Sequence, residues 1–437
     1  MTNPNRVTGI RIGKNQLTLL GLITLIVLAI AIIGGILAAV LNYTGGDKPT
    51  PFADETPEPG LSAGLEDGAT AVPTAIPTPT PTPAPVMRSA TIRSLGEIAM
   101  QQNLLYSVVD GNDYNFSEMF TEIASIMGDA DYTVGDVEGS MGGIATTSGS
   151  AKLVTPVSLI DVLADCGVDM LTVANDHALD GGVEDQQASL RNLADAGIEY
   201  IGGATSAEEK ATPKIVEING INVGFLAYTD NLNGNERTVP ASYAFCVNYI
   251  TRSTDPDADV KALRNAGADV VIAYCSWGEM LNRHFTDSQK TIANALVKAG
   301  VDVIIGYNPH VIQTAAWAEN TGADGNVHRT LVVGATGNLL SDQRGQYADS
   351  GVIFQFTIQE VEEGRFAITS PTYIPTYVWR SGVEGETNRY SYRVLPVGLW
   401  LDETPEGMSD EDAARMRQVW EEAQAIIPAD VAAVAAQ

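Results

Sequence analysis

The stretch Gly167-Val-Asp-Met-Leu-Thr-Val-Ala-Asn-Asp-His-Ala-Leu-Asp-Gly-Gly182 indicates how the folded part of this chain is built. It predicts a helix ending at Gly167, because glycine tolerates the left-handed backbone that closes many helices. The apolar run 170–174 then predicts a short buried strand, followed by a turn at Asn175-Asp176-His177. Ligands bind at the carboxyl ends of strands in open α/β sheets. Asp176 and His177 are therefore the first candidates for catalysis.

The same unit of helix, glycine, apolar strand and polar corner recurs at 196–203, 266–278 and 299–310. The last two repeats end in Ser276-Trp277-Gly278 and Asn308-Pro309-His310. Four such units predict an α/β layered domain in which successive corners meet along one edge.

The remaining elements follow from periodicity and turn residues. We expect strands at 90–95, ending in Gly96-Glu97, and at 132–134, before a corner at 135–139 that contains Glu138. Helices are expected at 116–127 and 156–164, and Ser409 should cap a further helix that extends to about residue 426. Hairpin strands are expected at 214–230, turning at Asn219-Gly220, with more strands at 329–338 and 352–377.

Composition excludes some classes of partner. The 437-residue chain has a formal net charge of −29 and a pI of about 4.3, with no cluster of Lys or Arg, so we expect no nucleic-acid partner. The three cysteines (Cys166, Cys246 and Cys275) have no CxxC spacing, and buried free thiols are the interpretation we favour.

The N-terminal region predicts a membrane anchor. Residues 1–16 carry Arg6, Arg11 and Lys14 and no acid, and residues 17–41 carry no charge. An apolar run of this length spans a bilayer core of roughly 30 Å, and it exceeds the apolar region of a cleaved signal peptide. The basic flank places residues 1–16 in the cytoplasm. The Pro/Thr-rich segment 42–87 then predicts a disordered linker, and 88–437 an extracellular domain whose helix and tail begin near 405.

Taken in order, the strand-end corners resemble those of the CapA family, the capsule or poly-γ-glutamate synthesis proteins, over nearly all of the folded part. Ala174-Asn-Asp-His-Ala-Leu-Asp-Gly-Gly182 follows the family's Ala-Asn-Asn-His-Ala-Leu-Asp-x-Gly motif. Ser276-Trp-Gly278 and Gly306-Tyr-Asn-Pro-His310 occupy the places of its His-Trp-Gly and Gly-His-His-Pro-His motifs. The resemblance implies a calcineurin-like metallophosphoesterase fold, an α/β/β/α sandwich.

The same resemblance implies a two-metal centre, formed by Glu97, Glu138, Asp176, position 276, Asn308 and His310. It implies that His177 stabilises a leaving group or a substrate anion. The chain departs from the family at Glu97 (for Asp), Asp176 (for Asn), Ser276 (for His) and Asn308 (for His). With these departures, the candidate ligand set is rich in oxygen atoms and poor in imidazoles. Such a set suits Mg²⁺, Mn²⁺ or Ca²⁺ better than a pair of imidazole-bound transition ions.

Structural roles compete with metal binding at each corner. Glu138 could be a solvated loop acid, Asp176-His177 a turn-stabilising pair, and Asn308-Pro309-His310 a cap on a following helix. We expect Asp180 to fix the start of the next helix and Trp277 to be a packing residue. His284 is a weak candidate to replace the imidazole missing at position 276.

The resulting expectation is a single-pass membrane protein that takes part in the biosynthesis, export or anchoring of an anionic cell-surface polymer. A membrane synthase or export complex is the partner that this role implies. Two alternatives stay open: an active extracytoplasmic metal-dependent phosphoesterase, favoured by Asp176-His177, and a non-catalytic binding module that kept the fold.

Overall fold

The computed structural model describes residues 10–12, 15–17, 87–111, 113–142, 152–250, 254–321, 327–383, 385–386 and 389–435. Residues 82–437 form one compact unit, and residues 1–81 form another, in which β1 (Ile10–Ile12) pairs with β2 (Asn15–Leu17). Leu17 therefore lies in a strand, so the predicted transmembrane helix does not begin at residue 17. The rest of that helix, 18–41, and the linker up to residue 86 lie outside the described residues. Among described residues, no helix is long and apolar enough to cross a bilayer.

The compact unit contains two large sheets. The first has the order β10-β9-β6-β3-β18-β19-β20, with β17 paired to β3 and β21 to β19. Its strands are β3 (Ser89–Ile98), β6 (Tyr132–Val137), β9 (Met170–Thr172), β10 (Glu199–Ile201), β17 (Asn338–Leu340), β18 (Ser350–Glu362), β19 (Arg365–Gly382), β20 (Tyr390–Pro396) and β21 (Ala432–Ala433). β10, β9, β6 and β3 run parallel, so their carboxyl ends share one edge.

The second sheet has the order β11-β12-β13-β14-β16-β15. Its strands are β11 (Ile215–Ile218), β12 (Ile221–Thr229), β13 (Val270–Ser276), β14 (Val303–Tyr307), β15 (Ala315–Thr321) and β16 (Val327–Val333). The β11–β12 hairpin turns at Asn219-Gly220, both at positive φ, as its Asn-Gly signal predicts. Small ladders pair β4 (Val109–Asp110) with β5 (Asp113–Tyr114) and β7 (Ser140–Met141) with β8 (Val154–Thr155).

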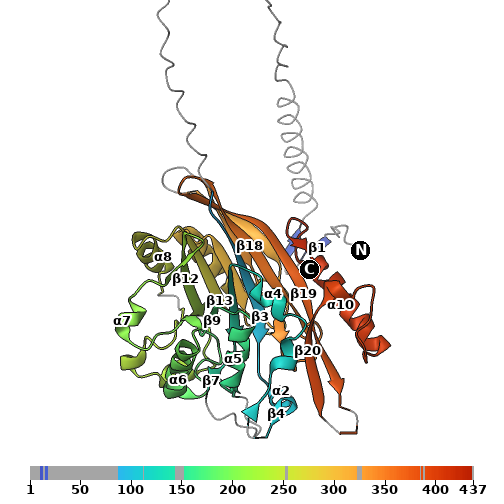
Figure 1. Ribbon diagram of the computed structural model, residues 1–437. Helices are drawn as coiled ribbons and strands as arrows, with labels where there is room; N and C mark the ends of the chain where they lie inside the picture. The colour runs from blue at the N-terminus through green and yellow to red at the C-terminus, as the bar shows by residue number, and fades with distance from the viewer. Residues whose placement is uncertain are drawn as a thin grey trace, which may run out of the picture. The chain divides into compact units, whose positions relative to one another are not determined.

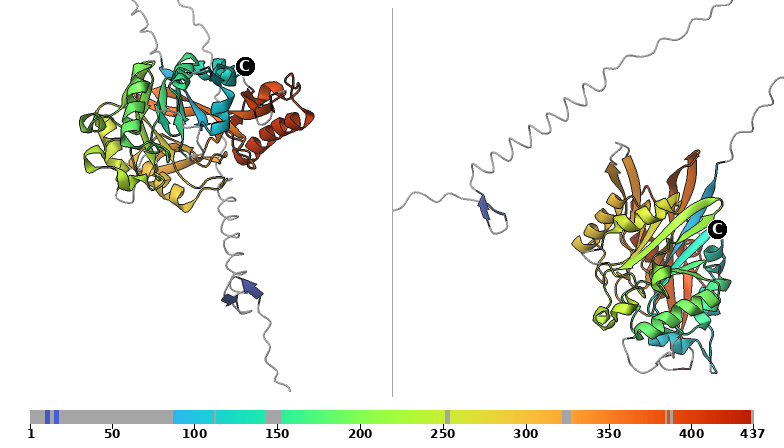
Figure 2. Two further views of the ribbon diagram at one scale, coloured as in Figure 1. Left: turned by 90° about the horizontal axis from the view of Figure 1, so that it is seen from below. Right: turned by 90° about the vertical axis from the view of Figure 1, so that its left-hand side faces the viewer.

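The two sheets pack face to face, with helices on both outer faces (Figures 1 and 2). On the first sheet these are α2 (Gln102–Ser107), α3 (Ser117–Phe120), α4 (Ala124–Gly128), α5 (Ser158–Asp165) and α6 (Gly182–Asp195). On the second they are α8 (Pro256–Asn265) and α9 (Asp287–Ala299). α10 (Asp410–Ile426) packs beside β19 and β20, and Ser409 caps it as predicted. The short helices are α7 (Ala207–Lys210), η1 (Asn235–Thr238), η2 (Ala241–Tyr243) and η3 (Val397–Trp400). The predicted layered α/β architecture is confirmed.

Three local predictions need correction. The four repeats do not share one sheet, since β9 and β10 belong to the first and β13 and β14 to the second. The helix predicted at 116–127 is two short helices, α3 and α4, separated by a turn at 121–123, where the φ angle of Ile123 lies outside the helical range. Gly96-Glu97 lies inside β3, since β17 continues the pairing there: the Glu97 amide donates to the Gly337 carbonyl at 2.8 Å.

Candidate functional site

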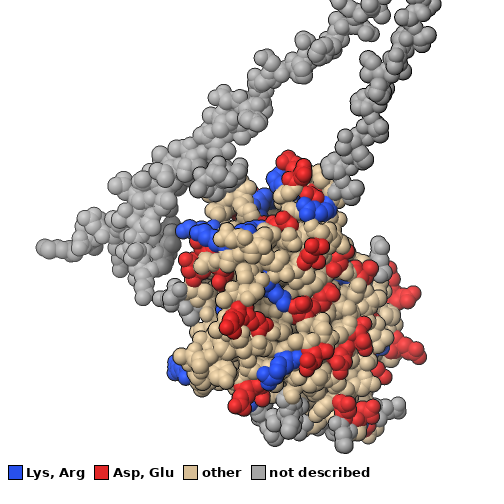
Figure 3. All heavy atoms as spheres, turned by 60° about the vertical axis from the view of Figure 1, so that its left-hand side comes forward, with Lys and Arg blue, Asp and Glu red and all other residues tan. Residues whose placement is uncertain are grey.

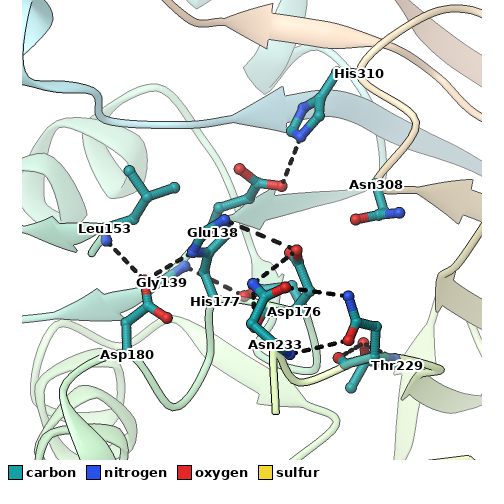
Figure 4. A network of polar contacts seen from close by, with 12 residues as sticks. Glu138, Gly139, Leu153, Asp176, His177, Asp180, Thr229, Asn233, Asn308 and His310 are labelled. Atoms are coloured by element: carbon teal, nitrogen blue, oxygen red, sulfur yellow. Dashed lines mark hydrogen bonds and ion pairs between the residues drawn. The ribbon is translucent and has the colours of Figure 1, made fainter. Parts of the chain in front are cut away.

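Three of the predicted ligands come together between the two sheets. Glu97 is near the end of β3, Glu138 follows β6, and His310 follows β14. His310 Nδ1 is 3.2 Å from Glu97 Oε2, and His310 Nε2 is 3.5 Å from Glu138 Oε1. One ligand atom from each side chain lies within 4.8 Å of the others, which is close enough to share one metal ion. We call Glu97, Glu138 and His310 the Glu–Glu–His cluster (Figure 4 shows Glu138 and His310).

The cluster is buried and short of compensating charge. Glu97, Glu138 and His310 are 0%, 2% and 3% exposed, so Glu138 is not a solvated loop acid. Among the described residues, neither carboxylate oxygen of Glu97 has a partner at hydrogen-bonding geometry, although the nearby backbone N–H groups of Asn308 and His310 act to lower its pKa. Burial, and then the charges of neighbouring acids, raise the pKa of Glu97 well above its ordinary value. Burial also raises the pKa of Glu138, although His310 opposes that shift. Buried carboxylates that lack hydrogen-bond partners fit a bound cation, because an unpaired buried charge is costly.

Asn338 fixes the orientation of the His310 ring. Its Nδ2 donates to the Ala348 carbonyl at 2.8 Å and to Gln343 Oε1 at 3.2 Å, so its Oδ1 is the atom turned toward His310. Oδ1 lies 3.0 Å from His310 Nδ1. This network places the ring proton on Nδ1 and leaves the Nε2 lone pair facing Glu138. A histidine held in this way by a second side chain is typical of metal ligands.

Asp176 lies beside the Glu–Glu–His cluster but outside the three-residue group (Figure 4). Asn233 Nδ2 donates to Asp176 Oδ2 at 3.0 Å and to the Asp176 carbonyl at 3.1 Å. The other carboxylate oxygen of Asp176 is buried and has no hydrogen-bond partner in the part of the chain that the structure describes. The charge of Asp176 also contributes to the raised pKa of Glu97 and of Glu138. The structure therefore brings this predicted ligand into the same site, with one oxygen free.

His177 is held by Asp180. His177 Nδ1 is 2.7 Å from Asp180 Oδ2, and that oxygen also accepts the Leu153 amide at 2.9 Å. His177 Nε2 lies 3.8 Å from Asp176 Oδ2. Burial lowers the pKa of His177, but the hydrogen bond to Asp180 and the charge of Asp176 outweigh burial and raise it. The expected role of Asp180 at a helix start is wrong, because α6 begins at Gly182 with Gly181 as its N-cap.

The two corners of the second sheet contribute less than the resemblance implies. Asn308 Nδ2 donates to the carbonyls of Trp277 and Gly278, each at 3.2 Å, which leaves only the amide oxygen of Asn308 as a ligand atom. The idea that 308–310 caps a helix is wrong, because the next element is the strand β15. Asn308 and His310 adopt positive φ angles of 88° and 58°. This left-handed backbone is uncommon outside glycine and recurs at functional sites.

The other residues considered in the sequence analysis lie outside the Glu–Glu–His cluster. Ser276 is buried at the end of β13, where it supplies a hydroxyl in place of an imidazole. Trp277 is a packing residue, as expected: it is 1% exposed and its Nε1 donates to the Gly334 carbonyl at 2.8 Å. His284 is exposed and does not join the Glu–Glu–His cluster. The three cysteines are buried and free, also as expected.

Sequence reasoning missed several polar residues around the Glu–Glu–His cluster. Asp136, inside β6, accepts a hydrogen bond from Thr172, and burial raises the pKa of Asp136 to about 7. Asp230, just after β12, has a pKa raised first by burial and in part by Asp176. Asp230 follows an apolar strand, as the recognised corners do, so its position was a usable signal. Asn233 and Asn338 gave no comparable signal, because their roles depend on contacts across the fold.

Comparisons with known proteins bear on family membership. Residues 91–343, more than half of the chain, match the model of the family described as "Bacterial capsule synthesis protein PGA_cap". The chain is 24% identical to the PGA biosynthesis protein CapA of Bacillus subtilis over 217 residues, which are 48% of this chain and 52% of that protein. It is 23% identical to the capsule biosynthesis protein CapA of Bacillus anthracis over 282 residues, 62% of this chain and 64% of that protein.

Similar solved structures include the NAD nucleotidase of Haemophilus influenzae, with a TM-score of 0.43 and 11% identity over 80% of this chain and 65% of that one. Another is the calcineurin-like phosphoesterase YfkN of Bacillus subtilis, with a TM-score of 0.38 and 12% identity over 77% of this chain and 98% of that one. The chain spans between half and two thirds of the length of the two curated relatives. On the strength of the match over residues 91–343, the chain belongs to the bacterial capsule synthesis protein PGA_cap family.

Proposed function

We propose that this protein takes part in the synthesis, export or anchoring of an anionic cell-surface polymer of the capsule or poly-γ-glutamate type. Family membership and the names of the two curated relatives support this role. We propose that the fold is of the calcineurin-like metallophosphoesterase type. Its two large sheets and outer helices support this assignment. A membrane synthase or export complex is the partner we propose.

We propose further that the Glu–Glu–His cluster holds a divalent ion, with Asp176 and the amide oxygen of Asn308 beside it. The observation that carries this step is the fully buried Glu97 carboxylate, whose ligand atom lies within 4.8 Å of those of Glu138 and His310. Carboxylates with a single imidazole suit Mg²⁺, Mn²⁺ or Ca²⁺. Such an ion would supply a positive charge for an anionic group of the ligand.

A bound cation would also reconcile an acidic protein with an anionic polymer. The formal net charge is −29, and acidic side chains are spread over the face drawn in Figure 3 with only scattered basic ones between them. Two polyanions repel each other unless cations screen or bridge them. Polymer binding by this protein should therefore be stronger with the divalent ion than without it.

Binding of poly-γ-glutamate to the purified full chain tests the polymer role. We expect binding in millimolar Mn²⁺ or Mg²⁺ and at least a tenfold loss of affinity when a chelator replaces the ion, measured at constant ionic strength. Equal concentrations of a monovalent salt serve as the control for simple screening. Binding that is unchanged by the chelator would contradict the bridging role of the ion, and no binding under any condition would count against this polymer.

A second candidate function, hydrolysis of an extracytoplasmic phosphoester, is favoured by the pair His177–Asp180 beside Asp176. Asp180 holds the His177 ring so that Nε2 faces Asp176, and the raised pKa of His177 favours its charged form. A protonated imidazole in that position can stabilise a substrate anion or donate a proton to a leaving oxygen. Ser276 and Asn308, which stand where the family has histidines, weigh against hydrolysis.

If the protein is a phosphoesterase, His177→Ala is expected to lower kcat by 10²–10⁴-fold, the usual contribution of a positioned acid. Asp180→Asn should lower kcat less, because it keeps the ring in place but withdraws the negative charge. A generic aryl phosphodiester with added Mn²⁺ gives the readout, and His284→Ala, which changes an exposed histidine, is the matched control. No turnover by the wild-type protein would leave a non-catalytic binding module.

We also propose a membrane anchor over residues 18–41, with a cytoplasmic N-terminus and residues 88–437 outside the cell. The uncharged run and the preceding Arg6, Arg11 and Lys14 support this orientation. Protease added to intact cells should then cleave the Pro/Thr-rich segment 42–87, and protection of that segment would contradict the orientation.

A further inference from the structure

A groove on the outer face of the first sheet contains a buried arginine. The groove has a volume of about 690 Å³ and lies between α4, the paired strands β18 and β19, and the segment after β21. Its lining includes Arg93, Ser125, Asp129, Gln355 and Thr372. A cavity of this volume is within the usual range for small-molecule sites.

Arg93 has only neutral partners. It lies in β3, is 7% exposed, and donates from Nε and Nη2 to Gln355 Oε1 at 3.0 and 2.6 Å. Its Nη1 donates to the Ile126 carbonyl at the end of α4. Among the described residues, no carboxylate oxygen lies within 4.0 Å of the Arg93 guanidinium, whereas Arg264 pairs with Asp302 and Arg415 with Asp349. Arg93 is therefore a buried cation without a paired anion.

The Arg93 guanidinium has N–H groups that its protein partners do not use. Burial lowers the pKa of Arg93 and Asp129 opposes that shift, but an arginine does not lose its proton in a protein. Three of its five N–H groups are used by Gln355 and Ile126, which leaves one on Nη1 and one on Nη2. A guanidinium with N–H groups free on both Nη atoms can donate to the oxygens of a carboxylate. The hydroxyls of Ser125 and Thr372 also line the groove.

We propose that the Arg93 groove binds a carboxylate-bearing ligand. The site is distinct from the Glu–Glu–His cluster, because Arg93 precedes Glu97 by four residues in β3, about 13 Å along an extended strand. A free small carboxylate and a glutamyl unit of a polymer offer the same group. Recognition of the polymer rests on the proposed function, whereas recognition of the carboxylate does not.

Titration calorimetry of the full chain in the presence of a chelator tests the proposal without a contribution from bound metal. The two probes are glutarate and a short γ-linked glutamate oligomer. We expect both to bind, with Arg93→Met weakening each at least tenfold and Asp129→Asn strengthening each by about 2- to 5-fold, as removal of an exposed like charge should. Tighter binding of the oligomer would identify a polymer as the ligand, and equal binding a small carboxylate.

The proposal is overturned if neither probe binds the wild-type protein, or if Arg93→Met binds as well as the wild type. Thermal melting identifies a variant that has not folded. If Arg93→Met does not fold, Arg93→Lys decides instead: it keeps the charge but lacks the two Nη donors, so weaker binding supports the site and unchanged binding overturns it. Oligomer binding in the chelator that is lost with Arg93 would uphold this groove even if the metal-dependent polymer role failed.

Discussion

Combining Glu138→Gln with His310→Ala is expected to abolish divalent-ion binding. The wild-type protein should retain at least one Mn²⁺, Mg²⁺ or Ca²⁺ per chain after purification without chelator, and the double variant none. The physical reason is the loss of two of the three ligands that lie within 4.8 Å of one another, one of them the imidazole. Elemental analysis of the full chain gives the stoichiometry directly.

A matched control separates ligand loss from general charge loss. Glu217→Gln with His284→Ala removes the same two residue types from exposed positions, and it should leave the ion count at the wild-type value. Circular dichroism would verify that both double variants are folded. If the cluster variant still carries the wild-type number of ions, Glu138 and His310 do not hold them, and the metal site we propose is wrong.

Gly306→Ala is expected to destabilise the fold by about 3 kcal/mol or more, because of overpacking against a rigid backbone. A Cβ atom at this glycine would lie 1.8 Å from the Gly334 carbonyl oxygen and 2.4 Å from Trp277 Nε1. These two atoms form the hydrogen bond that fixes Trp277, so the change would also break that bond. Denaturant unfolding measures the loss.

Gly382→Ala is the control for the glycine change, because a Cβ atom there would meet no atom of the described residues within 4 Å. It should alter the free energy of unfolding by less than about 0.5 kcal/mol, as surface substitutions usually do. Since Gly306 precedes Asn308 and His310 in the same corner, its replacement should also weaken ion binding. A Gly306→Ala protein with wild-type stability would show that β14 and the segment after β16 can move apart at little cost.

Local patterns predicted the layers, and the family resemblance named the three residues of the Glu–Glu–His cluster. The glycines at 167, 197, 267 and 300 all adopt positive φ, as the helix-ending role required. The resemblance to the CapA family implied that Glu97, Glu138 and His310 are ligands, and the structure places these three side chains together. Sequence patterns carry this information since it depends on the order of elements along the chain.

Contacts between segments far apart in the chain could not be predicted from the sequence. Asp180 was expected to serve a helix, but it binds His177 and the Leu153 amide, and nothing in the spacing indicates that contact. Asn233 reaches Asp176 from the loop after β12, in the other sheet. The extension of β3 through Glu97 depends on β17, more than two hundred residues later. Each of these roles is set by packing across the fold and not by local preference.

The left-handed backbone at Asn308 and His310 has an evolutionary consequence. Glycine adopts such φ angles without strain, so a change to glycine at either position would relieve a cost of order 1 kcal/mol. The same change would remove the ligand atoms, together with the hydrogen bonds that Asn308 and His310 make to Trp277, Gly278 and Asn338. A lineage that keeps both an imidazole at 310 and an amide at 308 is under continuing selection for what these side chains do, and variant libraries sorted separately for stability and for ion binding should diverge first at these two codons.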